Sequence, residues 1–302
     1  MQIAELVKLI KNRKAGGLSC NSRLAKKDSI FVAVKGARED GSKFIAEAVD
    51  RGAKFIVCDP KVKINRLGSA AVIRVKDTRL ALAKLAAQFY RNPSQRVKVI
   101  GITGTNGKTT ITYLLEAIFR EAGFPSGVIG TINYRFKNKV IPAKNTTPGP
   151  IELQSILARM EKAKIKYAAM EVSSHALDQE RAAEVRFHSA IFTNLTQDHL
   201  DYHKTLEGYF GAKLKLFKGL SSSSFAVINN DDKYAVRIKN ITRARIITYG
   251  IDNRADVAAG NIKFGVNHTE FDLLIRNRQV KFRINLIGRH NVYNTLAGIA
   301  WA

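Results

Sequence analysis

The sequence predicts an α/β protein, in which a small N-terminal α/β domain is followed by a larger central domain built on a mostly parallel sheet. Short apolar runs alternate with helical patterns along most of the chain. A cluster of polar and turn-forming residues interrupts this alternation at 91–95. A glycine-rich segment at 101–110 then joins an apolar run to an amphipathic helix. These three observations define the predicted fold class.

The predicted N-terminal domain covers residues 1–93. Its strand candidates are the apolar runs at 30–36, 55–58 and 70–75. The periodicity at 44–52 favours a helix. A new apolar run starts at Val97, directly after the turn-forming stretch that contains Pro93. We therefore place the domain boundary near Pro93 and assign residues 94–302 to the central domain.

The central domain continues with a helix after the glycine-rich segment. The apolar positions that repeat at helical spacing are Ile111, Leu114, Leu115, Ile118 and Phe119. Gly123 and Pro125 are expected to end this helix. Further strand candidates lie at 127–132, 166–172, 188–194, 225–230 and 245–249. Shorter alternating runs at 257–287 predict antiparallel pairing at one side of the sheet. Ligands are expected at the carboxyl ends of the parallel strands.

Composition and charge narrow the class of protein. The chain has 302 residues and a formal net charge of +25, which favours polyanionic partners such as nucleic acid, anionic lipid or phosphorylated substrates. Its two cysteines, Cys20 and Cys58, lie outside any CxxC or His-rich pattern, so neither a disulfide framework nor a zinc finger is expected. No apolar run approaches the roughly 18 residues of a membrane span. We expect a soluble, cytoplasmic protein.

The strongest local signal is the segment GITGTNGKTT at 101–110. Gly104 and Gly107 let backbone N–H groups approach a phosphate, and the following helix adds partial positive charge at its N-terminus. Lys108 would neutralise the β- and γ-phosphates, and the Thr109 hydroxyl would ligate Mg²⁺. The strict Walker spacing fails because Ile102 occupies the position of its first glycine. An ordinary glycine turn between a strand and a helix is the alternative interpretation.

Two further clusters follow strand candidates. Glu171 is the single carboxylate in the apolar run at its strand end, and it is either a Mg²⁺ ligand beside the phosphate loop or a solvent-facing side chain. A Ser-His hydrolase site at 173–175 is disfavoured because no GxSxG elbow surrounds it. His199 and His203 have the spacing of a helical metal site, but separate structural roles are favoured because the HExxH glutamate is missing.

The ends of two other helices are also informative. Thr147 is expected to cap a helix whose first residue is Pro148. This helix N-terminus is either a plain cap or a site for a phosphate or carboxylate. A C-terminal helix is expected to open at about Asn291 and to end on Ala-Trp-Ala without a cap or a polar tail. Because nothing is expected to bury that apolar helix end, the pattern predicts a further domain after residue 302.

The segments together resemble the Mur ligases of peptidoglycan synthesis, most closely the MurE type. The resemblance covers nearly the whole chain. Its motifs, in family order, are GTNGKTT, NTTP, MEVSSHAL, the Gln179 and Arg181 pair, FTNLTQDHLDYH, AKLKLF at 212–217 and GRHNVYN at 288–294. The resemblance implies a UDP-substrate-binding N-terminal domain, a phosphate-loop ATP-binding central domain, and the absence of the family's C-terminal amino-acid-binding domain.

The resemblance also implies roles for individual residues. ATP would be bound by Gly104, Thr105, Asn106, Gly107, Lys108, Thr109, Thr110 and, at the adenine, Asn291. The catalytic set would be Lys108, Lys213, Glu171 and His199, and two Mg²⁺ ions would be held by Thr109, Glu171, His199 and a carbamylated Lys213. The UDP-muramoyl dipeptide would be bound by Ser22, Arg23, Asn145, Thr146, Thr147, Ser173, Gln179 and Arg181.

The activity implied by the resemblance is ATP-dependent amide ligation. An acyl phosphate would form on UDP-N-acetylmuramoyl-L-alanyl-D-glutamate, and diaminopimelate or lysine would be added as the third amino acid. A monomer is expected. The alternatives are a MurF-type ligase and a nucleotide-binding fragment that does not turn over. A nucleic-acid-binding protein, suggested by the net charge alone, is disfavoured because no RRM, KH or helix-turn-helix signature is present.

Overall fold

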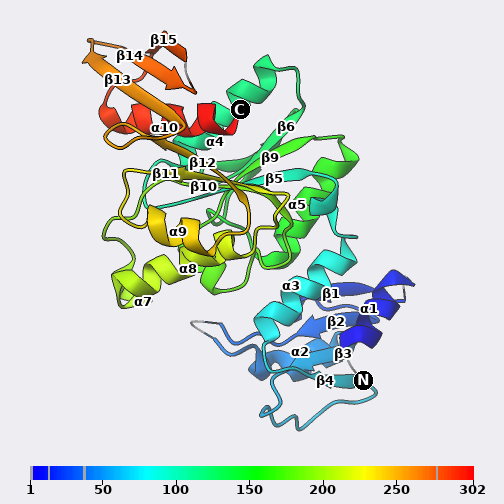
Figure 1. Ribbon diagram of the computed structural model, residues 1–302. Coiled ribbons are helices and arrows are strands. Elements are labelled where there is room, and N and C mark those ends of the chain that lie inside the picture. The colour runs from blue at the N-terminus through cyan, green and yellow to red at the C-terminus, as the bar shows by residue number, and fades with distance from the viewer. Residues whose placement is uncertain (1–2, 13, 37–38, 277) are drawn as a thin grey trace. The chain divides into compact units, whose positions relative to one another are not determined.

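The computed structural model describes residues 3–12, 14–36, 39–276 and 278–302 and divides into two compact units (Figure 1). Unit 1 comprises Met1–Pro93, Pro148–Arg159 and Gln179–Val185. Unit 2 comprises Ser94–Thr147, Met160–Asp178 and Arg186–Ala302. Two segments from the middle of the chain are therefore grouped with the N-terminal residues.

Unit 1 contains a four-stranded parallel sheet in the order β1-β2-β3-β4. Its elements are α1 (Ile3–Lys11), β1 (Gly17–Ser19), β2 (Ser29–Val32), α2 (Ile45–Asp50), β3 (Ala53–Cys58), β4 (Ala71–Arg74) and α3 (Thr78–Phe89), with short 3-10 turns at Ser22–Leu24, Gly41–Phe44 and Pro93–Gln95. Ile30 and Val32 pack with Leu6 of α1 and Leu85 of α3, whereas Phe31 packs on the other face. The sheet is therefore covered on both sides, as is usual for an all-parallel sheet.

Unit 2 contains an eleven-stranded sheet in the order β15-β14-β13-β12-β11-β10-β5-β9-β6-β7-β8. The strands are β5 (Lys98–Thr103), β6 (Ser126–Ile129), β7 (Asn133–Phe136), β8 (Lys139–Pro142), β9 (Tyr167–Glu171), β10 (Phe187–Phe192), β11 (Phe225–Asn229), β12 (Arg245–Gly250), β13 (Val257–Phe264), β14 (Thr269–Ile275) and β15 (Arg278–Ile284). Within this order, the strands β13, β12, β11, β10, β5, β9 and β6 are neighbours that run parallel to one another. The predicted α/β class with a mostly parallel central sheet is therefore confirmed.

Antiparallel strands flank this parallel core at both ends rather than at one. The pairing of β13, β14 and β15 confirms the expectation for 257–287. The hairpin of β7 and β8 was not predicted. Its turn lacks the glycine that usually marks a two-residue hairpin, and Lys137 adopts the left-handed conformation there, with φ of 48°. The missing glycine explains why the sequence pattern did not reveal this hairpin.

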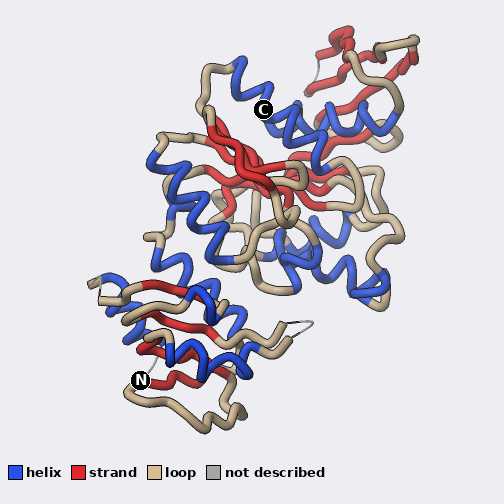
Figure 2. Tube along the Cα trace, turned by 180° about the vertical axis from the view of Figure 1, so that it is seen from behind, coloured by secondary structure: helices blue, strands red, loops and turns tan. Residues whose placement is uncertain are grey.

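Helices lie on both sides of the central strands of unit 2 (Figures 1 and 2). They are α4 (Lys108–Glu121), α6 (Ser174–Asp178), α7 (Leu200–His203), α8 (Leu206–Lys218), α9 (Ala235–Ile241) and α10 (Arg289–Trp301). Helix α5 (Pro150–Lys162) is grouped for the most part with unit 1. In Figure 1, α4 and α10 lie above the sheet, and α8 and α9 lie below it. Ile111, Leu115 and Phe119 of α4 are buried in one core cluster with Leu296 of α10, as the helical periodicity predicted.

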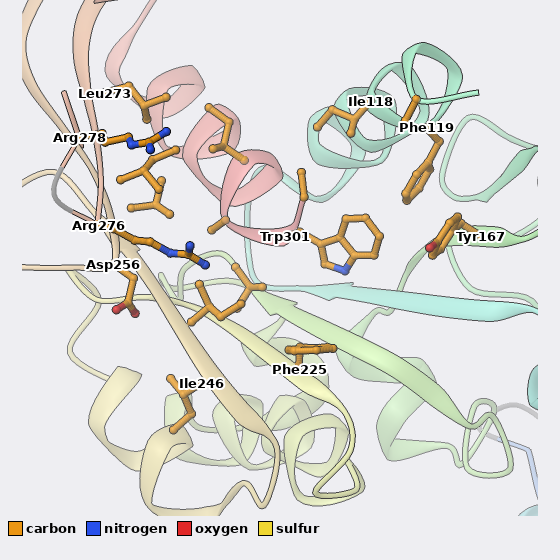
Figure 3. A pocket seen from close by; sticks show the side chains of 18 of the residues that line it. Ile118, Phe119, Tyr167, Phe225, Ile246, Asp256, Leu273, Arg276, Arg278 and Trp301 are labelled. Carbon is orange, nitrogen blue, oxygen red and sulfur yellow. The ribbon is translucent and has the colours of Figure 1, made fainter. Parts of the chain in front are cut away.

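The apolar end of α10 is partly covered in the structure, so the expectation that nothing buries it is wrong. The Trp301 ring lies edge-on to Phe119 and Tyr167, with ring centroids 5.0 and 5.6 Å apart. Its indole Nε1 donates a 2.6 Å hydrogen bond to Ser189 Oγ. Figure 3 shows these rings among the side chains that line a groove. The groove has a volume of about 1310 Å³, and the last residues of α10 help to line it. Tertiary packing therefore gives Trp301 the partners that the local sequence lacks.

Among the described residues, no helix combines the length and the apolar composition that crossing a membrane requires.

Candidate active site

A tight turn at 104–107 joins the buried strand β5 to the N-terminus of α4. Both glycines of this turn have positive φ, 152° at Gly104 and 89° at Gly107. A Cβ at Gly104 would lie 1.8 Å from Thr193 Oγ1, and one at Gly107 would lie 2.3 Å from Asn294 Oδ1. Only glycine fits at either position. The first N–H groups of α4 have no acceptor within the helix, so the turn can bind an anion.

The end of β10 holds this turn in place. The N–H groups of Thr105 and Asn106 donate to the carbonyl and side-chain oxygens of Asn194, at 2.9 and 3.0 Å. Thr193 Oγ1 donates to the Asn106 carbonyl at 2.6 Å. The shape of the turn therefore depends on a strand that lies about ninety residues later in the chain.

Lys108 folds back over the turn. Its Nζ donates to the carbonyl oxygens of Gly104 and Thr105, at 3.0 and 2.7 Å. Burial lowers the pKa of Lys108, and the negative charges of Glu171 and Asp198 oppose this effect. An amine held above the loop is in a position to meet a phosphate bound there.

Glu171 ends β9 and is 1% exposed, so the interpretation of a solvent-facing carboxylate is wrong. Its Oε2 accepts hydrogen bonds from the hydroxyls of Thr109 and Thr131, at 2.9 and 3.1 Å. Its Oε1 accepts from the backbone N–H of Thr131 at 2.9 Å. The carboxylate is thus held against the first turn of α4.

Lys213 is buried on the inner face of α8, with 2% of its surface exposed. Its Nζ donates to the Gly104 carbonyl at 2.8 Å and lies 4.2 Å from the centre of the Tyr209 ring. Burial, together with the neighbouring charge of Lys108, lowers the pKa of Lys213 well below its ordinary value. These surroundings favour the neutral amine.

His199 and His203 differ in their polar contacts, although both rings lie near that of His175, with ring centroids 4.8 and 5.5 Å away. His199 precedes α7 in a left-handed conformation with φ of 52°, and its Nε2 lies 3.5 Å from Asp198 Oδ2. His203 Nε2 lies 2.9 Å from Ser174 Oγ. Within the part of the chain that the structure describes, no three His, Cys, Asp or Glu side chains gather as a metal site.

A polar cavity of about 260 Å³ connects these elements at the carboxyl ends of the strands. Its lining residues are Thr105, Asn106, Gly107, Lys108, Thr109, Thr110, Thr131, Thr146, Glu171, Ser173, Ser174, His199, Tyr209 and Lys213. Of the residues singled out in the sequence, the phosphate loop, Glu171, His199 and Lys213 therefore share one cavity. It lies where the topology of a parallel α/β sheet places ligands.

The donor set fits a magnesium–nucleotide complex. Mg²⁺ prefers oxygen ligands and is commonly held by one or two carboxylates together with substrate phosphates. Glu171 is a buried carboxylate that faces the cavity, and the Thr109 hydroxyl lies 2.9 Å from it. The amine of Lys213, in contrast, offers no oxygen in its unmodified form. The protein thus supplies a few hard oxygen atoms rather than a closed metal cage.

The segment with Thr146 and Thr147 differs from expectation at the helix start. Helix α5 begins at Pro150, and the carbonyl of Gly149 accepts its first hydrogen bond, from the N–H of Leu153. The prediction of Thr147 as cap and Pro148 as first helical residue is wrong, because Pro150 takes that position. The buried hydroxyl of Thr147 instead donates to the Glu171 carbonyl at 2.9 Å.

The candidate substrate-binding residues Asn145, Thr146 and Thr147 make hydrogen bonds within unit 2. Thr147 Oγ1 accepts from the Ser173 N–H at 3.0 Å. Thr131 Oγ1 lies 3.1 Å from Thr146 Oγ1, and the Asn145 carbonyl accepts from the Tyr134 hydroxyl at 2.6 Å. Three adjacent residues are thus anchored to β7, to β9 and to the segment after β6.

Asn291 lies in the first turn of α10, which begins two residues earlier than expected, at Arg289. Its side-chain nitrogen donates to the Ile287 carbonyl at 2.9 Å, and its oxygen accepts from Asn294 at 3.2 Å. Asn294 is the residue whose oxygen a Cβ at Gly107 would meet. The Asn291 side chain is thus connected to the phosphate loop through Asn294.

The remaining candidates belong to unit 1. Arg181 Nη2 donates to Gln179 Oε1 at 2.7 Å, so the two side chains form one polar pair. Ser22 is buried, and its hydroxyl donates to Glu47 Oε2 at 2.6 Å. Arg23 is exposed. Ser22 therefore already has a carboxylate partner within its own unit.

Residues 102–302 match the Mur ligase middle domain, and residues 14–90 match the Mur ligase family catalytic domain. The chain belongs to the Mur ligase family. A UDP-N-acetylmuramoyl-L-alanyl-D-glutamate–2,6-diaminopimelate ligase of Geobacter sulfurreducens is 44% identical over 95% of this chain and 57% of the relative. The ligase of the same name from Aquifex aeolicus is 43% identical over 96% of this chain and 59% of the relative.

Solved Mur ligase structures share the fold. A UDP-N-acetylmuramoyl-L-alanyl-D-glutamate–2,6-diaminopimelate ligase superposes with a TM-score of 0.82 and 28% identity, over 94% of this chain and 58% of the other. MurF from Acinetobacter baumannii superposes with a TM-score of 0.65 and 26% identity, over 94% and 58%. This Mur ligase chain spans 57–63% of the length of the curated relatives described above and others like them.

Three cavity residues of this Mur ligase were missed in the sequence: Thr131, Ser174 and Tyr209. Ser174 lies beside the predicted Ser173, but no sequence feature separates the two. Thr131 follows Gly130 directly after a strand, and such a strand-end position was a usable signal. Tyr209 lies one helical turn before Lys213, and its hydroxyl lies 3.3 Å from Thr105 Oγ1.

Proposed function

We propose that the chain binds ATP with two Mg²⁺ ions at the loop 104–110 and activates UDP-N-acetylmuramoyl-L-alanyl-D-glutamate for amide ligation to diaminopimelate or lysine. The observation that carries the proposal is the single cavity shared by the loop, Glu171, His199 and Lys213. The names of the curated relatives favour diaminopimelate.

The proposed reaction has two steps. An oxygen of the D-glutamyl γ-carboxylate attacks the γ-phosphorus of ATP, the bond from that phosphorus to the bridging oxygen breaks, and ADP leaves with the electron pair. The amine of the incoming amino acid then adds to the carbonyl carbon of the acyl phosphate, loses a proton, and phosphate leaves. The protein contributes mainly positioning and charge compensation to such a transfer.

The loop residues have distinct roles in this proposal. The N–H groups at the start of α4 would bind the terminal phosphates. Lys108 would exchange the carbonyl oxygens of Gly104 and Thr105 for phosphate oxygens, since its amine already lies within about 3 Å of the turn. Asn291 would contact the adenine.

Thr109, Glu171, His199 and a carbamylated Lys213 would hold the two Mg²⁺ ions, which when bound offset the negative charge of the transferring phosphoryl group. Carbamylation suits Lys213 because burial favours its neutral, nucleophilic amine. Attack of Nζ on CO₂ forms an N–C bond and releases a proton. The product presents anionic oxygen atoms where an ammonium would repel a cation.

The D-glutamyl end of the substrate would lie at the proposed ATP and Mg²⁺ site, and its uridine end would lie at the N-terminal domain. We assign residues 1–93 to UDP-substrate binding and 94–302 to ATP binding. The proposed contacts are Ser22 and Arg23 at the uridine end, and Asn145, Thr146, Thr147, Ser173, Gln179 and Arg181 along the phosphates, sugar or peptide. The proposal includes a cytoplasmic monomer with no nucleic-acid partner.

Calorimetric titration of the chain with ADP and Mg²⁺ tests the proposal. We expect binding that Lys108→Ala weakens by at least tenfold, because a charge-assisted contact to phosphate is lost. The exposed residue Lys162 provides the matched control, and Lys162→Ala should bind like the unaltered chain. Equal binding by Lys108→Ala would reject the assignment.

Substrate class is tested with UDP-muramoyl peptides of different length. We expect the UDP-muramoyl dipeptide to bind and to promote ADP formation from ATP. Preference for the tripeptide would favour the MurF type, and binding of nucleotide and dipeptide without ADP formation would indicate a binding fragment. Tight, salt-sensitive binding of DNA or RNA would support the nucleic-acid alternative.

A further inference from the structure

Thr131 contacts both oxygens of the buried carboxylate Glu171, although it belongs to none of the motifs noted in the sequence. Its backbone N–H donates to Oε1 at 2.9 Å, and its hydroxyl donates to Oε2 at 3.1 Å. Two donors from one residue fix the plane of the carboxylate more firmly than a single contact. The orientation of Glu171 therefore depends on Thr131.

The sheet register brings Thr131 to this position. In the parallel pairing of β6 and β9, Ile129 lies opposite Met170, so the residues that follow β6 pass beside Glu171. Gly130 makes the close approach possible, because a Cβ there would lie 2.3 Å from Glu171 Oε1. A small residue followed by a hydroxyl residue is thus needed directly after β6.

The same hydroxyl also lies 3.1 Å from Thr146 Oγ1. A threonine hydroxyl carries one proton and can accept further hydrogen bonds. The Thr131 hydroxyl is placed to donate either to Glu171 Oε2 or to Thr146 Oγ1, at 3.1 Å each, and its single proton can serve only one of them at a time. The three groups form a hydroxyl chain in which the Thr131 hydroxyl stands between its two acceptors, Glu171 Oε2 and Thr146 Oγ1.

We propose that Thr131 is a positioning residue that orients Glu171 for Mg²⁺ and connects it, through the hydroxyl chain, to the substrate side of the cavity at Thr146. The inference rests on the proposed function, because it assigns Glu171 to the metal. A substrate group that engages the Thr146 hydroxyl would change how the Thr131 proton is shared between Thr146 and Glu171. Metal and substrate would then bind with coupled free energies.

The test compares Thr131→Val with Thr131→Ser, measuring ADP binding by calorimetry with and without Mg²⁺. Valine keeps the shape and the backbone N–H but removes the hydroxyl, and serine restores the hydroxyl. Thr131 itself is exposed in the cavity, and thermal unfolding of both variants checks that each is folded under the assay conditions. Partners of metal ligands typically affect metal affinity by roughly tenfold to a hundredfold. We expect Thr131→Val to weaken Mg²⁺-dependent ADP binding by about tenfold and to leave metal-free ADP binding unchanged. We expect Thr131→Ser to bind ADP like the unaltered chain in both conditions.

The connection to Thr146 is tested by a double-mutant cycle with Thr146→Val, read as the Mg²⁺ concentration at half-maximal ADP binding. Coupled hydroxyls predict that the effects of the two changes are not additive. The inference is overturned if Thr131→Val needs no more Mg²⁺ than the unaltered chain, or if Thr131→Ser binds as weakly as Thr131→Val. It is also overturned if the effects of Thr131→Val and Thr146→Val on the required Mg²⁺ concentration are additive. If the unaltered chain binds no Mg²⁺–ADP, the proposed function fails first, and the metal role of Thr131 with it.

Discussion

The amines of Lys108 and Lys213 donate hydrogen bonds to the same carbonyl oxygen, that of Gly104, at 3.0 and 2.8 Å. Two ammonium groups sharing one acceptor in a buried setting would repel each other. Burial lowers the pKa of both lysines, and the charge of Lys108 lowers the pKa of Lys213 further. The fold therefore favours loss of a proton from one of the two amines. Lys213 is the more deeply buried of the two, so its amine is the one expected to lose the proton.

We expect Lys213 to take up CO₂ at neutral pH, where exposed lysines remain protonated. Labelled bicarbonate should give a carbamate carbon resonance that Lys213→Ala removes, and added bicarbonate should increase Mg²⁺-dependent ADP binding. Lys218, an exposed residue of the same helix, is the control, and Lys218→Ala should keep both signals. A carbamate resonance that survives in Lys213→Ala would contradict the assignment.

Stability should rise with pH in CO₂-free buffer. The pKa of Lys213 is lowered in the fold, whereas in the unfolded chain this lysine titrates near its ordinary value of about 10.4. Between these two values the unfolded state binds more protons, so the free energy of unfolding increases with pH. Urea unfolding across this window should show a smaller slope for Lys213→Met than for Lys218→Met. Identical slopes would mean that the Lys213 amine is not desolvated.

Gly104→Ala should destabilise the protein by several kcal/mol and abolish nucleotide binding, because the new Cβ would lie 1.8 Å from Thr193 Oγ1 at a φ of 152°. Gly211, inside α8, is the matched control, because an added Cβ there would meet no side chain or backbone outside its own helical turn within 4 Å. Gly211→Ala should be neutral or stabilising by about 1 kcal/mol. Thermal unfolding measures both, and an unperturbed Gly104→Ala protein would show that the turn is not constrained.

Trp301→Phe should destabilise the chain by about 1–3 kcal/mol, because it leaves the fully buried Ser189 hydroxyl without the indole donor. In Trp301→Phe combined with Ser189→Ala, both partners are apolar and much of this loss should be recovered. Urea unfolding of the two single variants and the double variant forms the cycle. Strictly additive losses would assign the effect of Trp301 to ring packing alone.

The strand–turn–helix unit around Gly104 and Gly107 and the parallel sheet follow from local patterns in the sequence. Apolar periodicity and glycine placement report on the conformation of adjacent residues, and for β5 and α4 they agree with the structure. They fail at the β7–β8 hairpin, whose turn lacks glycine, and at Thr147, whose hydroxyl bonds to β9 rather than to its own helix.

Local patterns could not decide which lysine of α8 is buried, or that Thr131 holds Glu171. Lys213 differs from the exposed Lys218 only in the face of the helix that packs inward, and that face is set by the sheet and the loop beneath it. Thr131 meets Glu171 because two strands forty residues apart pair in one register. The amino-acid sequence thus predicted the strand–turn–helix unit and the candidate chemical groups, whereas long-range pairing and burial decided which of these groups face the same cavity.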